Sequence, residues 1–116
     1  MSGARTVPRA SVPLILESPE RVADGMGGYR MVWRPLGIVY AQLRAGSGGE
    51  RQGEVGASSI VAWRISLRAA RMGDPRRPRP EQRFRMGMRV FRIDAVAEAD
   101  PAGLWLDCMA REERLA

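Results

Sequence analysis

The chain has 116 residues, of which 45% are hydrophobic and 28% charged, and its formal net charge at pH 7 is +6. This length suits a single domain with one modest core, and no apolar run approaches the ~20 residues of a membrane-spanning helix. Histidine is absent and cysteine occurs once, which excludes the usual general base, an internal disulfide and a cysteine-cluster metal site.

The N-terminal segment carries no pattern of secondary structure. Residues 1–12 combine proline with small polar residues and predict a flexible arm. They also lack the apolar centre of a secretory signal, so we expect the chain to be assembled in the cytoplasm. Residues 13–113 predict one domain, followed by a frayed C-terminus at residues 114–116.

Period-two alternation marks the first strands. Residues 14–18 form a short apolar run that Pro19 is expected to end, and residues 24–30 are Gly-rich and predict a turn. The next run alternates, which predicts a strand that Pro35 interrupts. The side chains expected on the buried faces of this strand and its continuation are Tyr29, Met31, Trp33, Val39, Ala41 and Leu43.

A long Gly-rich connection, residues 44–58, leads to the clearest strand of the chain. Connections of this length in compact domains are usually functional or disordered. The strand that follows alternates four apolar residues on one face with mostly polar residues on the other. The four residues expected to point inward are Val61, Trp63, Ile65 and Leu67.

The stretch from Gly73 to Arg92 holds seven arginines and three prolines. The prolines forbid a regular ladder, so the first part of the stretch predicts an extended loop. From residue 83 onward, apolar residues alternate with arginines, which are therefore expected on the solvent faces of two strands. The loop arginines are Arg76, Arg77 and Arg79, and the strand arginines are Arg83, Arg85, Arg89 and Arg92.

Two further turns divide the C-terminal third of the chain. Gly87-Met88 predicts a hairpin turn, and the strand after it is expected to run to about Val96. A second turn at residues 98–103 leads into the last strand. The residues expected to point inward from that strand are Leu104, Leu106, Cys108 and Ala110.

These elements together predict an all-β fold. Six or seven short strands, regular turns and no convincing helix are typical of a small antiparallel β-barrel or sandwich, here with a long Gly-rich loop and a mobile N-terminal arm. Trp33, Trp63 and Phe91 are assigned to the core. Trp105 falls on the face opposite its apolar neighbours, and it is a candidate interface anchor.

The chemistry expected of the chain is correspondingly limited. Cys108 lies between apolar residues and is interpreted as a small core residue rather than a nucleophile. The Gly-rich stretch from Ala45 to Gly56 lacks the GK[ST] ending of a phosphate-binding loop, and no carboxylate pair is spaced for acid/base catalysis. We therefore expect no enzyme: no catalytic residue, no metal site and no cofactor.

The order of these pieces is similar to that of a known family. In sequence they are a turn and aromatic strand (DGMGGYRMVW), the step VYAQL, a loop with a glutamate (SGGERQGEVG), the strand WRISLR, the hairpin RFRMGMRVFRI and the ending LDCMARE. The series resembles the head–tail joining family of tailed bacteriophages, also called head-closure, stopper or adaptor proteins, with relatives in phage-derived gene transfer agents. It spans Val12 to Glu113. Tyr40, where the family often has tryptophan, and the arginine-rich loop depart from the pattern.

This resemblance implies a β-barrel subunit in the neck of a virion or gene transfer agent particle. Six copies would form a ring below the portal and adaptor proteins, close the DNA-filled head, and present a surface to tail terminator or tail-tube proteins. The Gly-rich loop would project toward the channel or a neighbouring ring. The end of the packaged double-stranded DNA is among the implied contacts, and a membrane is not.

Residues on two loops are the candidates for such contacts. The three arginines of the proline-rich loop, Arg76, Arg77 and Arg79, are expected to dock on an acidic neighbour or to touch the DNA end. The alternative hypothesis is a nucleic-acid-binding small β-barrel, which would stack bases on exposed aromatic residues, but the basic stretch offers only Phe84 and Phe91, both interpreted as core. The candidate contact residues are Glu50, Arg51, Glu54, Arg76, Arg77, Arg79 and Trp105.

Overall fold

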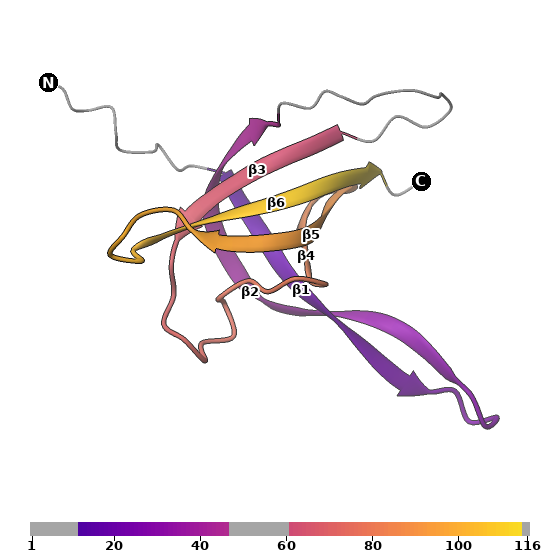
Figure 1. Cartoon of the computed structure of the whole chain (residues 1–116). Coiled ribbons are helices and arrows are strands. Elements are labelled where there is room, and N and C mark those ends of the chain that lie inside the picture. Colours follow the sequence, from indigo (N-terminus) through magenta and orange to yellow (C-terminus); the bar gives the residue numbers. More distant parts are fainter. Residues whose placement is uncertain (1–11, 47–60, 115–116) are drawn as a thin grey trace, which may run out of the picture.

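The computed structural model describes residues 12–46 and 61–114, and Figure 1 shows that this part of the chain is built from strands connected by turns and one longer loop. The described residues contain no helix. The six strands are β1 (Val12–Ala23), β2 (Tyr29–Ala45), β3 (Val61–Arg68), β4 (Arg83–Met86), β5 (Arg89–Glu98) and β6 (Trp105–Arg114).

All six strands belong to one antiparallel sheet that closes on itself in the order β1-β2-β3-β6-β5-β4. The closing contact pairs β4 with β1 through only three positions, Ile15 with Arg85, Leu16 with Phe84 and Glu17 with Arg83. Closure leaves the paired part of the sheet without free edges. The predicted all-β class with antiparallel strands is therefore confirmed.

The core fills the inside of the closed sheet. Alternate residues of each strand point into it, as the period of two requires, and Phe84 and Phe91 have no exposed surface. The inward residues predicted for the second half of β2 lie there or pack against it, and so do Trp63, Ile65 and Leu67 of β3. The prediction for Val61 is wrong, because this first residue of β3 lies at the end of the closed sheet and is 44% exposed. The buried cluster comprises Leu14, Leu16, Val39, Ala41, Ile65, Leu67, Phe84, Phe91, Ile93, Leu106, Cys108 and Ala110.

The outer halves of β1 and β2 form a two-stranded ribbon that projects beyond the closed sheet (Figure 1). The predictions that Pro19 ends one strand and that Pro35 interrupts the other are wrong, because Pro19 pairs with Trp33 and Pro35 with Glu17. A strand with only one partner leaves alternate N–H groups outside the ladder, so an edge position tolerates the missing donor of proline.

The ribbon also explains why Tyr29 and Met31 are not buried as predicted. Their side chains are 63% and 55% exposed, since they lie on a part of β2 that no other strand of the sheet covers. The ribbon ends in a tight turn at Asp24, whose carboxylate accepts hydrogen bonds from the backbone N–H groups of Met26 and Gly28 at 2.7 and 3.0 Å. These bonds lower the pKa of Asp24.

A β-bulge separates the ribbon from the closed sheet. Leu16 pairs with Gly37 and Glu17 with Pro35, so Leu36 is the extra residue of β2. Leu36 packs against the core cluster. Gly37 has a φ of 153°, and a Cβ there would lie 2.8 Å from Cγ of Arg76, so the bulge and the loop between β3 and β4 fit closely only with glycine at this position.

The C-terminal strand departs from prediction at both ends. Leu104 was expected to point inward but is 51% exposed, because it belongs to the turn before β6, where its carbonyl oxygen accepts the N–H of Ala69. At the other end β6 continues to Arg114, which pairs with Arg89 of β5. The strand therefore includes the first residue of the segment expected to fray.

Candidate interaction surface

Trp33 lies outside the core, contrary to prediction, at the point where the ribbon meets the closed sheet. Its ring is covered by two guanidinium groups, with the Cζ atom of Arg83 4.2 Å and that of Arg92 5.4 Å from the ring centroid. Cation–π contacts of this kind are worth about 0.5–2 kcal/mol each, depending on desolvation. The base of the ribbon is thus held against the outer faces of β4 and β5.

The arginine nearest to Trp33 is buried, although the alternation predicts it on a solvent face. Arg83 donates from Nε to Oε1 of Glu17 at 2.6 Å, and both residues are less than a tenth exposed. Arg85 approaches the second oxygen of the same carboxylate at 3.9 Å. The sequence could not indicate this pair, because Glu17 and Arg83 come together only through the closing contact between β1 and β4.

Arg89 is likewise engaged rather than free. Its guanidinium donates to both carboxylate oxygens of Glu112, at 2.6 and 3.1 Å, while Nε1 of Trp63 donates to the same carboxylate at 2.9 Å. The hydrogen bonds from Arg89 to Glu112 raise the pKa of Arg89. Trp63 in turn meets Phe91 edge to face, with ring centroids 6.0 Å apart, so it packs on the core as predicted.

The loop between β3 and β4 has no regular secondary structure, as predicted, but it contains tight turns. Asp74 accepts the backbone N–H of Arg76 at 2.8 Å and its Nε at 3.5 Å, and these contacts lower the pKa of Asp74. Two of the three candidate arginines of this loop serve its own structure. Arg76 bonds Asp74, and Arg77 donates from Nη1 to the carbonyl oxygen of Ala70 at 2.8 Å.

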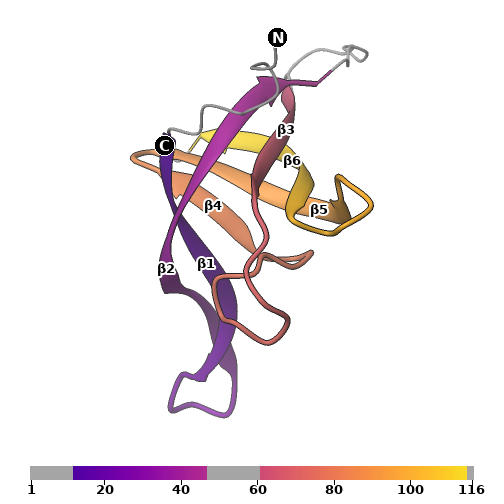
Figure 2. The same ribbon diagram turned by 90° about the vertical axis from the view of Figure 1, so that its left-hand side faces the viewer.

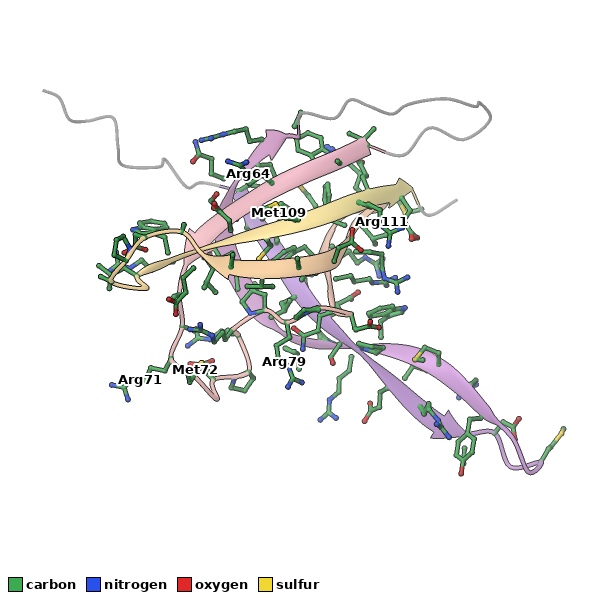
Figure 3. All side chains as sticks on the ribbon, viewed as in Figure 1. Arg64, Arg71, Met72, Arg79, Met109 and Arg111 are labelled. Carbon is green, nitrogen blue, oxygen red and sulfur yellow. The ribbon has the colours of Figure 1, made fainter. Side chains whose placement is uncertain are left out.

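The third candidate, Arg79, is the one that the loop presents outward. Its side chain is exposed and makes no ion pair with any carboxylate of the described residues. Arg71 and Met72, which the sequence did not single out, stand at the tip of the same loop, and Met72 is 80% exposed. Figure 3 shows Arg71, Met72 and Arg79 pointing away from the closed sheet on its loop side.

A hollow of about 580 Å³ lies between this loop and the base of the ribbon. Leu36, Pro78 and Val96 supply its apolar lining, and Arg79 and Met72 belong to its wall. Figures 1 and 2 both place the ribbon and the loop at the same end of the closed sheet. We call the hollow, Arg71, Met72 and Arg79 the loop face.

Trp105 occupies a different position from the loop face. It is half-buried, and the Cζ atom of Arg68 lies 5.3 Å from its ring centroid. Its backbone N–H donates to Asp100 at 2.8 Å, and this bond is the largest of the contacts that lower the pKa of Asp100. The predicted outward direction of Trp105 is consistent with this contact, and its role at an interface stays a prediction.

Three of the candidate contact residues, Glu50, Arg51 and Glu54, lie outside the described residues. Phe84 and Phe91 are fully buried, as predicted, so they offer no surface on which a nucleic acid base could stack.

Cys108 is buried, as predicted, and burial raises the pKa of its thiol to about 12. No group of three metal-ligating side chains comes together within residues 12–46 and 61–114. In the same part of the chain, no helix has the length and apolar character needed to span a bilayer.

The family model described as phage head completion protein matches residues 7–113. A solved chain from the virion of a native gene transfer agent particle is 54% identical and superposes with a TM-score of 0.77, covering 95% of this chain and 100% of that chain. No curated protein matches the sequence.

Proposed function

Because the chain belongs to the phage head completion protein family, whose model spans residues 7–113, we propose that it is a structural component of the head–tail connector of a tailed phage or gene transfer agent particle. In this role it joins the DNA-filled head to the tail and carries out no catalysis. The observation that carries the proposal is the likeness, over 95% of this chain, to a protein of a gene transfer agent virion.

The proposed assembly is a closed ring, with six copies as the expected number. A ring that closes by rotation needs two different complementary surfaces on each subunit. The projecting ribbon and the closed sheet are two such surfaces, because the ribbon extends beyond the sheet instead of folding onto it. Neighbours of other kinds would be portal or adaptor proteins on the head side and tail terminator or tail-tube proteins on the tail side.

The loop face is the proposed contact with an anionic neighbour. Arg71 and Arg79 are exposed, and neither makes an ion pair with a carboxylate of the described residues. A guanidinium group suits either a carboxylate or a phosphate in bidentate geometry. The partner of the loop face is therefore an acidic protein surface or the end of the packaged double-stranded DNA.

Electron microscopy of particles assembled without this chain tests the proposal. We expect heads that package DNA but leak and remain tailless, with joining restored when the wild-type chain is supplied. Full particles with normally attached tails in the absence of the chain would overturn the connector role. Mass spectrometry of purified wild-type particles gives the control, since a connector component must be present in them.

A further inference from the structure

The outward surface of β2, β3, β6 and β5 carries two arginines directly opposite each other. Arg44 of β2 pairs in register with Arg64 of β3, and Arg64 pairs with Met109 of β6. Arg44 and Arg64 are both exposed. Directly opposed side chains on antiparallel strands have Cβ atoms about 4.5–5.5 Å apart, and like charges there destabilise the sheet.

No carboxylate of the described residues forms an ion pair with either arginine. Asp107, two pairing positions away on β6, accepts the hydroxyl of Ser66 at 2.7 Å. Asp94 is occupied by Arg111, whose guanidinium donates to both of its oxygens at 2.8 and 2.9 Å. Neither Arg44 nor Arg64 makes an ion pair within residues 12–46 and 61–114. The two guanidinium groups are thus exposed and have no ion-pair partner among the described residues.

The surroundings of the two arginines distinguish a protein partner from a nucleic acid. Next to them lie the half-exposed Met109 and the small side chains of Ala62 and Ala95, all on the outward face. Methionine and arginine are enriched in protein–protein interfaces. Nucleic-acid interfaces are more polar and much more strongly basic. A partly apolar surface with two exposed guanidinium groups therefore fits a protein that presents carboxylates.

We propose that Arg44, Arg64 and Met109 form the centre of a second docking face, and that its occupant is an acidic surface of a different protein of the particle. The face is separate from the loop face, since Figure 3 shows Arg64 and Met109 on the opposite side of the closed sheet from Arg71 and Arg79. This inference rests on the proposed connector role, because it places the partner in the same particle.

The absence of lysine makes a direct test available. All nineteen basic residues are arginine, so R64K introduces one unique side-chain amine. A carbodiimide joins such an amine only to a carboxylate in direct contact. We expect R64K particles to yield an amide between residue 64 and an aspartate or glutamate of another protein, identified by mass spectrometry. The isolated R64K chain should give no such amide to a described carboxylate.

R111K is the matched control, since Arg111 lies on the same face but already bonds Asp94. It should give the internal amide to Asp94 in the isolated chain and in particles alike. The inference would be overturned by a link from residue 64 to Glu50 or Glu54, or to another copy of this chain. It would also be overturned if particles that contain R64K gave no link from residue 64. If the wild-type chain itself is absent from particles, the connector proposal fails instead.

Charge reversal gives a second readout in which stability and assembly move in opposite directions. R64E places a carboxylate opposite Arg44, so the isolated chain should resist denaturant at least as well as wild type. We expect its amount per particle to fall at least tenfold. R76A is the control, since it removes an exposed arginine that bonds Asp74 and belongs to neither docking face, and its amount should stay within twofold of wild type. Equal incorporation of R64E and R76A contradicts the inference, as does a loss of salt-dependent binding to double-stranded DNA in R64E alone.

Discussion

Cys108 has no exposed surface, and burial raises the pKa of its thiol from 9.0 to about 12. The folded chain therefore keeps this proton to higher pH than the unfolded chain. The free energy of unfolding should fall as pH rises from about 9 toward 12, by up to about 1.4 kcal/mol per pH unit. Denaturant titrations across this range measure the slope, which is easily isolated because the chain has no lysine to titrate there.

C108A is the control for this alkaline slope. The substitution lowers stability at every pH through the lost packing, but it should remove most of the pH dependence above 9. A slope as steep in C108A as in wild type would assign the titration to another group. In the folded chain at pH 8, the thiol should also react with iodoacetamide only after denaturant is added.

The buried pair of Glu17 and Arg83 makes a second residue-scale prediction. E17Q leaves the Arg83 guanidinium buried without a full counter-charge, and removal of one partner of a buried ion pair costs about 3–5 kcal/mol. Equilibrium unfolding in urea measures this loss. The double variant E17L/R83M should be more stable than E17L, because it removes both charges. A double variant less stable than E17L would show that Arg83 stabilises the fold without Glu17, through contacts such as the one with the Trp33 ring.

At the scale of elements, the Trp33 contact fixes the direction of the ribbon. W33A removes the ring under Arg83 and Arg92, so we expect residues 18–23 and 29–34 to exchange their amide hydrogens at least tenfold faster. Amides of β3 and β6 should keep their wild-type rates, since those strands pair only within the closed sheet. Uniformly faster exchange across both regions would mean that Trp33 supports the whole fold.

How far the sequence predicts each element depends on how many strands cover it. In β3 and the inner part of β6, neighbours lie on both sides and a core on one face, so alternation predicts Ile65, Leu67 and Cys108 correctly. The ribbon keeps the same alternation without a core, and the pattern therefore placed Trp33 and Met31 inside. Alternation reports the two faces of a strand, but it does not report which of them another strand will cover.

The candidate contact residues could be predicted only in part, for the same reason. Proline and arginine spacing predicts the loop between β3 and β4, but the engagement of Arg76 and Arg77 depends on Asp74 and the carbonyl of Ala70. Arg71, which forms no ion pair within the loop, carries no distinguishing local pattern. The opposition of Arg44 and Arg64 depends on strand register, and the long connection between β2 and β3 hides that register from the sequence.

At the scale of the whole molecule, the loop face makes a prediction about assembly. R71E/R79E reverses two exposed charges that form no ion pair with a described carboxylate, so the isolated chain should change in stability by no more than about 1 kcal/mol. We expect tail joining, counted by electron microscopy, to fall at least tenfold. R76A is the comparison, since Arg76 bonds Asp74 within the loop. Joining that survives R71E/R79E but not R76A would assign the effect to loop structure.

The place where the ribbon leaves the sheet has a mechanical consequence. Glu17 pairs both with Pro35 inside the ribbon and with Arg83 across the closing contact. The ribbon is therefore a lever whose fulcrum lies on the shortest strand pairing of the molecule. A load applied at its tip exerts torque on the three residue pairs that keep the sheet shut, and a neighbour that grips the ribbon gains leverage over the closure of the subunit.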